Sequence, residues 1–340
     1  MSCEPRKTLE PLEEEKNRQI SWLRNCQILC PGSTADGAIK RYPNVAWITP
    51  YFANFAAAAL LEDPKSIPLV RRYLDWYIRH LEPDGTVYDY QYEGNDWGNG
   101  RNCVKKVPPD SEDAYAGTFL SLVCLYCQKS GDYKWAAENL PFLFKISQVI
   151  TSLTDGDGLT FALAKYRVKY LMDNCEAWRG LYDFSQLLFS LGDQRAEHFK
   201  KQAGLLAAGV EKYLWNARRR CYHPAKIGFF KSPVNLKIFY PDAVAQLFPA
   251  LYGLIDPGSQ RALSLYQVFN AHQPGWVTIT PPDYPWVLLA YCACLHGDQK
   301  SALQKLNYVQ KSYIENNSSY WFCSEAAFFV LTAAKLLKEI

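Results

Sequence analysis

The stretch DAYAGTFLSLVCLYCQKSGDYKW, residues 113–135, contains an apolar segment, a short hinge and the start of a second helix. Residues 113–127 are apolar on most sides, which is typical of a helix that lies inside a fold. Gly131 and Asp132 then supply a helix C-terminus and an acidic N-cap for the helix that follows. The stretch therefore predicts a helical hairpin with one buried arm.

The same hinge of small and acidic residues recurs as LLEDPKS from 60, SLGDQRA from 190, GLIDPGSQ from 253 and LHGDQKS from 295. An apolar segment precedes each hinge, and an amphipathic segment such as VRRYLDWYIRHL, from 70, follows it. With an opening helix at 13–29, amphipathic and buried helices alternate six times. This alternation predicts an all-α fold, the (α/α)6 toroid with an inner and an outer ring, as a single domain over 1–340. A solenoid would have repeats of more similar length.

One proline interrupts the pattern. Pro141 falls inside AAENLPFLFKISQVI, residues 136–150, which is the third amphipathic segment. Because proline lacks the N–H group that a helix interior uses, we expect a break there or a helix that begins near Pro141.

The composition excludes several classes of protein. Hydrophobic residues make up 49% and charged residues 21%, which is typical of a globular protein. The 37 basic and 34 acidic residues give a net charge of +3 with the signs interspersed, which argues against a nucleic-acid partner. No apolar run is long enough to span a membrane, and the first residues do not resemble a signal peptide. We therefore expect a cytoplasmic protein with no membrane partner.

Metal and cofactor sites are not expected. The 11 cysteines are scattered, which argues against a disulfide framework, and the single C-x-x-C of Cys124 and Cys127 lies in apolar text that favours core thiols over zinc. TDGDGL, from 154, begins like a calcium loop but has Tyr166 at the twelfth position, where a carboxylate is needed.

Carboxylates recur where the buried helices begin. The simplest explanation is that an anion is favourable at a helix N-terminus, and Asp110 or Ser111 can also cap the helix that starts near 113. In a toroid, however, these helix starts converge at one end, where the long connections also lie. Two such carboxylates can act as acid and base in glycoside hydrolysis. The catalytic candidates are Asp113 and Asp173, with Asp36, Asp89 and Asp242 in reserve.

Aromatic residues crowd the same connections. An aromatic face matches the C–H face of a sugar ring, although some of these rings would instead pack the loops. The candidate substrate-binding residues are Trp47, Tyr51, Tyr88, Trp97, Tyr115, Trp178, Tyr240, Trp286 and Trp321, with Glu176 as a further polar contact.

Three phrases carry a resemblance to a known superfamily. DGAI and VAWITPY from 36 and 45, DSEDAYAGTFLSLVCLYCQKSGD from 110, and YLMDNCEAWRGLYDFSQLLFSLGD from 170 together resemble the six-hairpin glycosidases, over nearly the whole chain. The resemblance implies a cofactor-independent glycoside hydrolase that acts on an oligosaccharide with inversion. It also implies that acid and base lie at inner-helix N-termini, where Asp113 and Asp173 match.

Two alternatives remain open. A sugar epimerase on the same toroid would use histidines as bases, and His223 and His272 lie near the relevant end. A toroid without activity would bind a carbohydrate or a protein through the same aromatic residues. The oligomeric state is not predicted.

Overall fold

The computed structural model describes residues 4–45, 47–92, 103–278 and 285–339. It divides into two compact units, which are described separately. Unit 1 comprises residues 1–79, 88–107 and 275–340, and unit 2 comprises residues 80–87 and 108–274. The single domain therefore stays a prediction. Among the described helices, none combines the length and the apolar character needed to cross a membrane.

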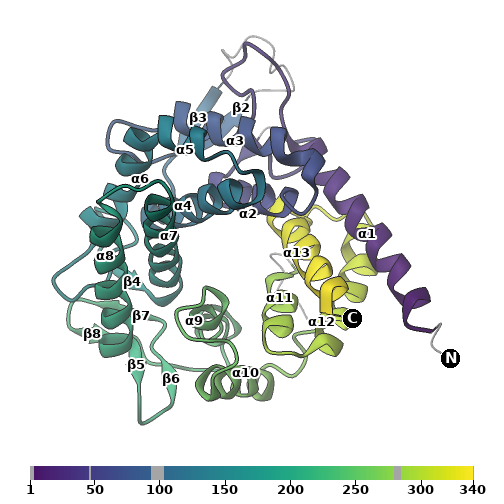
Figure 1. Ribbon diagram of the computed structural model, residues 1–340. Coiled ribbons are helices and arrows are strands. Elements are labelled where there is room, and N and C mark those ends of the chain that lie inside the picture. The colour runs from purple at the N-terminus through teal and green to yellow at the C-terminus, as the bar shows by residue number, and fades with distance from the viewer. Residues whose placement is uncertain (1–3, 46, 93–102, 279–284, 340) are drawn as a thin grey trace. The chain divides into compact units, whose positions relative to one another are not determined.

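Unit 1 is built around its C-terminal helix. Helix α13 packs against α1, α2 and α11, as Figure 1 shows, and it is the apolar segment that closes the chain. A short antiparallel sheet of order β1-β2-β3 accompanies the helices. The elements of unit 1 are α1 (Glu4–Cys26), β1 (Trp47–Ile48), α2 (Pro50–Leu60), α3 (Ile67–Arg79), β2 (Asp89–Tyr92), β3 (Cys103–Val107), α11 (Leu288–Leu295), α12 (Gln299–Val309) and α13 (Cys323–Glu339).

Unit 2 is built around helix α7, which packs against α4 and α8 (Figure 1). Its strands form an antiparallel sheet of order β4-β7-β8 and a separate β5-β6 pair. The elements of unit 2 are α4 (Glu112–Ser130), α5 (Tyr133–Glu138), α6 (Leu140–Leu153), β4 (Val168–Tyr170), α7 (Leu171–Ser190), α8 (Ala196–Gly209), β5 (Trp215–Asn216), β6 (Cys221–Tyr222), β7 (Ala225–Ile227), β8 (Phe230–Lys231), α9 (Phe248–Leu251) and α10 (Gln260–His272).

The hinges end and begin helices as the sequence predicts. Gly131 ends α4 in the left-handed conformation, with φ of 74°, and the Asp132 carboxylate accepts a hydrogen bond from the Trp135 N–H at 3.1 Å. Asp298 caps α12 in the same way through the Ser301 N–H at 3.0 Å. Each such cap stabilises its helix by about 1 kcal/mol. The predicted helical hairpins are confirmed within each unit.

Prolines divide two of the predicted helices. The expected break at Pro141 is confirmed, because α5 ends at Glu138 and α6 begins at Leu140. The apolar segment that precedes the hinge at 253 is predicted to be one helix, but regular α-helix is confined there to α9, at Phe248–Leu251. Pro249 explains this difference, because it has no N–H and its ring crowds the carbonyl group of the preceding turn.

Ammonium groups occupy the loop that begins like a calcium site. The Lys169 Nζ donates to Asp155 Oδ2 at 2.6 Å and to Asp157 Oδ1 at 2.7 Å, while the Lys226 Nζ donates to Asp157 Oδ2 at 2.7 Å. The hydrogen bond from Lys169 lowers the pKa of Asp155. The Lys169 side chain is only 1% exposed and that of Asp157 12%, so the ion pair between them is part of the core of unit 2, whereas Asp155 lies at the surface.

The C-x-x-C motif lies in the core. Cys124 and Cys127 are both buried in α4, and burial raises the pKa of each thiol to about 12. A thiol that resists ionisation is a poor metal ligand and a poor nucleophile. The two residues therefore serve as packing groups, as their apolar neighbours predict.

Candidate active site

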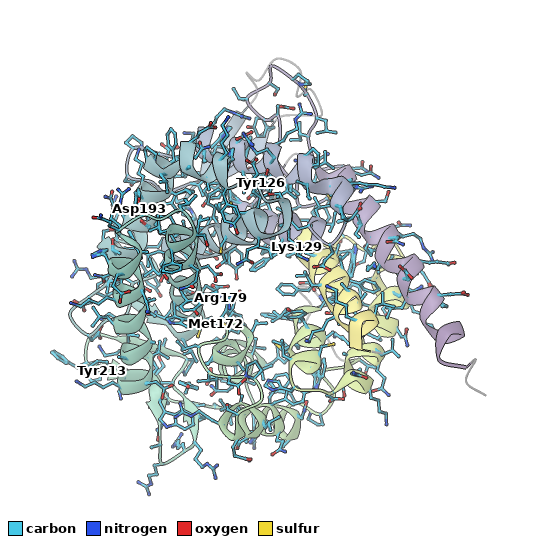
Figure 2. All side chains as sticks on the ribbon, viewed as in Figure 1. Tyr126, Lys129, Met172, Arg179, Asp193 and Tyr213 are labelled. Atoms are coloured by element: carbon cyan, nitrogen blue, oxygen red, sulfur yellow. The ribbon has the colours of Figure 1, made fainter. Side chains whose placement is uncertain are left out.

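Two glycines set the crossing of α4 and α7. A Cβ atom on Gly117 would lie 2.5 Å from the Glu176 carbonyl oxygen, and one on Gly180 would lie 2.4 Å from the Gly117 Cα. Only glycine allows two helix backbones to approach this closely. The contact fixes the register between the helices, so that Asp113 and Asp173, in their first turns, face a common region. Figure 2 shows the side chains along both helices, including Met172 and Arg179 on α7.

One hydroxyl group joins the two carboxyl groups. The Ser111 Oγ lies 2.8 Å from Asp113 Oδ1 and 3.0 Å from Asp173 Oδ2. A serine hydroxyl has a single proton to donate. The two carboxyl groups therefore either share this proton in a three-centre hydrogen bond, or one of them is itself protonated and donates to the Ser111 oxygen. The structure thus brings together the two residues that the sequence predicts as the catalytic pair.

Asp113 is the enclosed member of this pair. It is 0% exposed, and its oxygens also accept hydrogen bonds from the Thr160 hydroxyl at 2.5 Å and the Ala114 N–H at 2.9 Å. Burial raises the pKa of Asp113 to about 6, and the hydrogen bonds from Thr160 and Ser111 oppose that rise. Three donors therefore stabilise the ionised form of Asp113 near neutral pH, in a position that a substrate does not reach.

Asp173 is the more accessible member. Its side chain is only partly buried in the first turn of α7. Burial raises the pKa of Asp173 well above its usual value, and the negative charges of Asp113 and Glu176 raise it further. Each of these effects favours the protonated form of Asp173, so of the two carboxyl groups it is the better placed to hold a proton. A carboxylic acid with a raised pKa that is also partly exposed has the properties of a general acid.

Polar and aromatic side chains of unit 2 surround Asp173. Glu176 follows one turn later on α7, is 2% exposed, and accepts a hydrogen bond from the Tyr252 hydroxyl at 2.7 Å. Tyr240 is 51% exposed, and its partial burial and the charge of Asp173 raise its pKa to about 12. Trp178 stacks on Tyr182 with 5.5 Å between ring centroids. Tyr240 thus provides an exposed ring near Asp173.

The reserve carboxylates have structural partners. Asp242 is 7% exposed and accepts a hydrogen bond from a backbone N–H at 2.6 Å. In unit 1, Asp36 forms an ion pair with Arg72 at 3.1 Å, and Asp89 accepts a hydrogen bond from the Thr49 hydroxyl at 2.9 Å. These contacts support a structural role for each of the three residues.

Several of the aromatic residues that are predicted to bind the sugar are buried. Tyr115, Trp286 and Trp321 are 4%, 6% and 3% exposed, and the Trp321 indole donates a hydrogen bond to Gln19 at 3.0 Å. A buried ring has no free face for a sugar. These three residues therefore pack the interior of their units.

The other described aromatic residues of unit 1 that are predicted to bind sugar are partly exposed. The Arg41 guanidinium lies over the Trp47 ring, 4.1 Å from its centroid, while Tyr51 and Tyr88 are half-buried. Trp97 lies outside the described residues. The substrate-binding roles of these four residues stay predictions.

Unit 1 holds a buried carboxyl group that the candidate residues did not include. Glu325 lies in the first turn of α13, is 3% exposed, and accepts a hydrogen bond from the Val287 N–H at 2.7 Å. Burial raises its pKa to about 7. The only signal in the sequence is its position at the start of an apolar helix, which it shares with Asp113 and Asp173.

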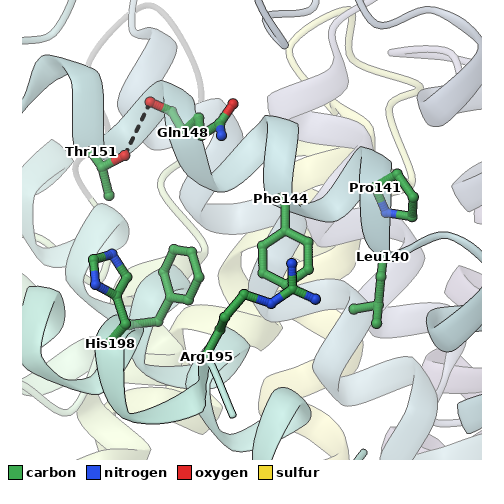
Figure 3. Close-up of a pocket in the computed structure, with 8 residues that line it drawn as sticks. Leu140, Pro141, Phe144, Gln148, Thr151, Arg195 and His198 are labelled. Carbon is green, nitrogen blue, oxygen red and sulfur yellow. Dashed lines mark hydrogen bonds between the residues drawn. The ribbon is translucent and has the colours of Figure 1, made fainter. Parts of the chain in front are cut away.

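A cavity of about 620 Å³ lies between α6 and α8 (Figure 3). The Arg195 guanidinium lies 3.6 Å from the centroid of the Phe144 ring and forms an ion pair with Asp193. The lining contains no carboxyl group, so this cavity cannot supply an acid and base pair. It is lined by Leu140, Pro141, Phe144, Gln148, Thr151, Arg195, His198 and Phe199.

The histidines that an epimerase would need have other surroundings. His223 Nδ1 lies 2.8 Å from the Ser232 carbonyl oxygen, and His223 Nε2 lies 3.3 Å from Asn216 Nδ2. Both ring nitrogens are thus engaged within the β-strand region of unit 2. His272 is exposed in the last turn of α10. This geometry favours paired-carboxyl chemistry over epimerisation.

Solved structures with a similar fold include glycosidases. A wild-type glycosidase matches with a TM-score of 0.68 and 11% identity over 97% of this chain and 98% of that chain. A glycosidase variant in complex with glucose matches at 0.69 and 11%, with the same coverage. A GH63 mannosylglycerate hydrolase from Thermus thermophilus, in complex with glucose, matches at 0.64 and 10%, over 94% of this chain and 99% of that chain. No protein-family model and no curated protein matches the sequence.

The likeness extends over almost the full length of both chains. It confirms the predicted fold class, all-α of the (α/α)6 type, which this chain shares with these solved structures. At 10–12% identity the likeness concerns the fold.

Proposed function

We propose that this protein is a glycoside hydrolase that cleaves an oligosaccharide and that Asp173 is its general acid. The observation that carries the proposal is the Ser111 hydroxyl shared between Asp113 and Asp173, which holds the two carboxyl groups close together and so favours a proton on one of them. The fold of known glycosidases supports the same chemistry. In such a reaction a protonated carboxyl group must face the glycosidic oxygen.

The chemistry assigns different roles to the two aspartates. Asp173 donates its proton to the leaving oxygen as the bond to the anomeric carbon breaks. Asp113 does not touch the substrate and is a positioning residue, whose charge keeps the proton on Asp173. When Asp173 is ionised, the two carboxylates compete for the one hydroxyl of Ser111. That competition favours return of the proton to Asp173 before the next turnover.

Other features of the proposal come from the sequence. The sequence predicts acid and base in the pair Asp113 and Asp173, but because Asp113 is enclosed, another carboxylate must activate the attacking water. Inversion at the anomeric carbon is the expected outcome. We also expect a single domain, a cytoplasmic location and no cofactor. The sugar, the linkage and the position of cleavage within the oligosaccharide are to be found by experiment.

The proposal is tested by incubating the purified protein with a panel of oligosaccharides and following products by NMR. We expect cleavage of at least one member and an initial product of inverted anomeric configuration. Cleavage with retention of anomeric configuration would contradict the expected inversion but not the proposed hydrolase activity. Binding of an oligosaccharide without cleavage of any member would instead identify a carbohydrate-binding toroid, and interconversion of sugars without cleavage would identify an epimerase.

Substitution of Asp113 should change the pH dependence of the reaction. In an Asp113→Asn variant the negative charge that raises the pKa of Asp173 is lost, so Asp173 ionises at lower pH than in the wild type. Because the acid must be protonated, the high-pH limb of the kcat/KM profile should move to lower pH. The loss of activity should therefore be smaller at pH 5 than at pH 8.

A matched control removes a different buried carboxylate of the same unit. Asp242 is 7% exposed and is hydrogen bonded to backbone, and an Asp242→Asn variant should leave the high-pH limb in place. An Asp113→Asn profile that is lowered equally at every pH would contradict the proposed role, since it would indicate only structural damage.

A further inference from the structure

One segment of unit 2 has an unusual charge. Residues 212–241 contain no aspartate or glutamate, whereas the rest of the chain has more acidic than basic residues. The net charge of +3 for the whole chain does not reveal this difference between the segment and the rest of the chain. The basic residues of the segment are Lys212, Arg218, Arg219, Arg220, Lys226, Lys231 and Lys237.

The same segment exposes large apolar side chains at the tip of a β-hairpin. Gly228, with φ of 55°, and Phe229 form the two-residue turn between β7 and β8, and Ile227 pairs with Phe230 across it. Phe229 is 99% exposed, Phe230 is 83% exposed and Ile227 is 54% exposed. Clustered apolar side chains on a surface mark an interaction site more often than isolated ones do.

The hairpin tip is held in place by the rest of unit 2. Ile227 pairs with Val168 of β4, and the Ser232 N–H donates to the Ala225 carbonyl oxygen at 2.9 Å. The ion pair between Lys226 and Asp157 anchors the base of β7. The phenylalanines therefore project from a paired sheet and not from a loose chain end.

Exposed cations accompany the tip. Lys231 directly follows Phe230 and is exposed, as are Lys237 and the arginines at 218–220. Arg219 donates to the Val234 carbonyl oxygen at 3.4 Å, which joins the turn between β5 and β6 to the chain that leaves β8. The exposed apolar tip thus has basic groups on the segments beside it.

In contrast to the expectation from sequence of no membrane partner, we propose that the β7–β8 hairpin binds the surface of an anionic lipid bilayer, with Phe229 and Phe230 in the headgroup boundary. Apolar side chains that enter this boundary and basic groups that face anionic headgroups act together in interfacial binding. Each Lys or Arg near such a surface adds electrostatic attraction that falls with salt. A nucleic acid would engage the cations but would leave the projecting tip without an apolar partner.

The test is sedimentation of the full-length protein with vesicles of phosphatidylcholine, with or without phosphatidylserine. We expect the wild type to bind the vesicles that contain phosphatidylserine and to bind them less tightly as salt rises. A Phe229→Ser, Phe230→Ser double variant should bind at least about tenfold more weakly. A Phe189→Ser variant is the control, because Phe189 is 78% exposed at the end of α7 and should not affect binding.

A Lys231→Glu variant tests the electrostatic part and should weaken binding to phosphatidylserine vesicles while leaving the fold intact by circular dichroism. The proposal is overturned if the wild type binds neither kind of vesicle, or if the double variant binds as tightly as the wild type. Equal losses in the double variant and in Phe189→Ser would also overturn it, as would binding to a DNA oligonucleotide in place of vesicles. None of these measurements depends on hydrolase activity.

Discussion

An Asp173→Asn variant is expected to lose kcat by about 10²- to 10⁴-fold, with little change in KM. Asparagine has nearly the same shape as aspartic acid and can still donate a hydrogen bond to Ser111, but it cannot transfer a proton to the leaving oxygen. A substrate with an aryl leaving group of low pKa needs little protonation. With such a substrate, the loss of kcat in the Asp173→Asn variant should therefore be much smaller than with the oligosaccharide found in the screen.

The control for this variant is Asp193→Asn. Asp193 lies just beyond the opposite end of α7 and pairs with Arg195, at roughly 30 Å from Asp173 by the rise of the helix. Its replacement by asparagine should leave kcat unchanged with both substrates. An equal loss with the aryl substrate and the oligosaccharide would assign Asp173 a role other than proton donation.

A Gly117→Ala variant should lose stability and activity together. The new methyl group would meet backbone atoms of Glu176 at 2.5 Å, so α4 and α7 would have to separate. Overpacking of this kind costs about 1–3 kcal/mol, and we expect about 3 kcal/mol or more because the obstacle is backbone. Separation of the helices would also part Asp113 from Asp173. Urea denaturation and kcat measure the two effects.

Gly204 provides the opposite case on the neighbouring helix. It is exposed in α8, and an added Cβ would meet no atom within 4 Å. A Gly204→Ala variant should therefore gain about 0.5–1 kcal/mol from the better helix propensity of alanine, with kcat unchanged. If Gly117→Ala were as harmless as Gly204→Ala, the close crossing of α4 and α7 would not be needed for the site.

The hairpin pattern could be predicted because its signals are local. Gly131, Asp132 and Pro141 act on the backbone within a few residues, so their effects are readable from sequence. Pro249 is an equally local signal, but the apolar residues around it favour a continuous helix, so the interruption was not predicted. The short strands were not predicted, because residues such as Val168 and Ile227 pair across long connections.

The roles within the site depend on tertiary contacts. The starts of two apolar helices pointed to Asp113 and Asp173 alike, and Ser111 was identified only as a possible cap. The difference between the two aspartates arises from Thr160, which is 47 residues away from Asp113 and encloses it. No spacing in the sequence indicates which of two helix-start carboxylates is enclosed in this way.

Two lysines of unit 2 form ion pairs that link three segments of the chain which could otherwise unfold locally and independently. Lys169 on β4 and Lys226 on β7 both bind Asp157, in the loop after α6. Loss of any one segment would leave charged groups without partners in a poorly hydrated place, which is costly. The loop, β4 and β7 should therefore exchange their amide protons as one cooperative unit. A displacement of the β7–β8 hairpin would then be transmitted to β4, which pairs with β7 and leads directly into the first turn of α7, where Asp173 lies.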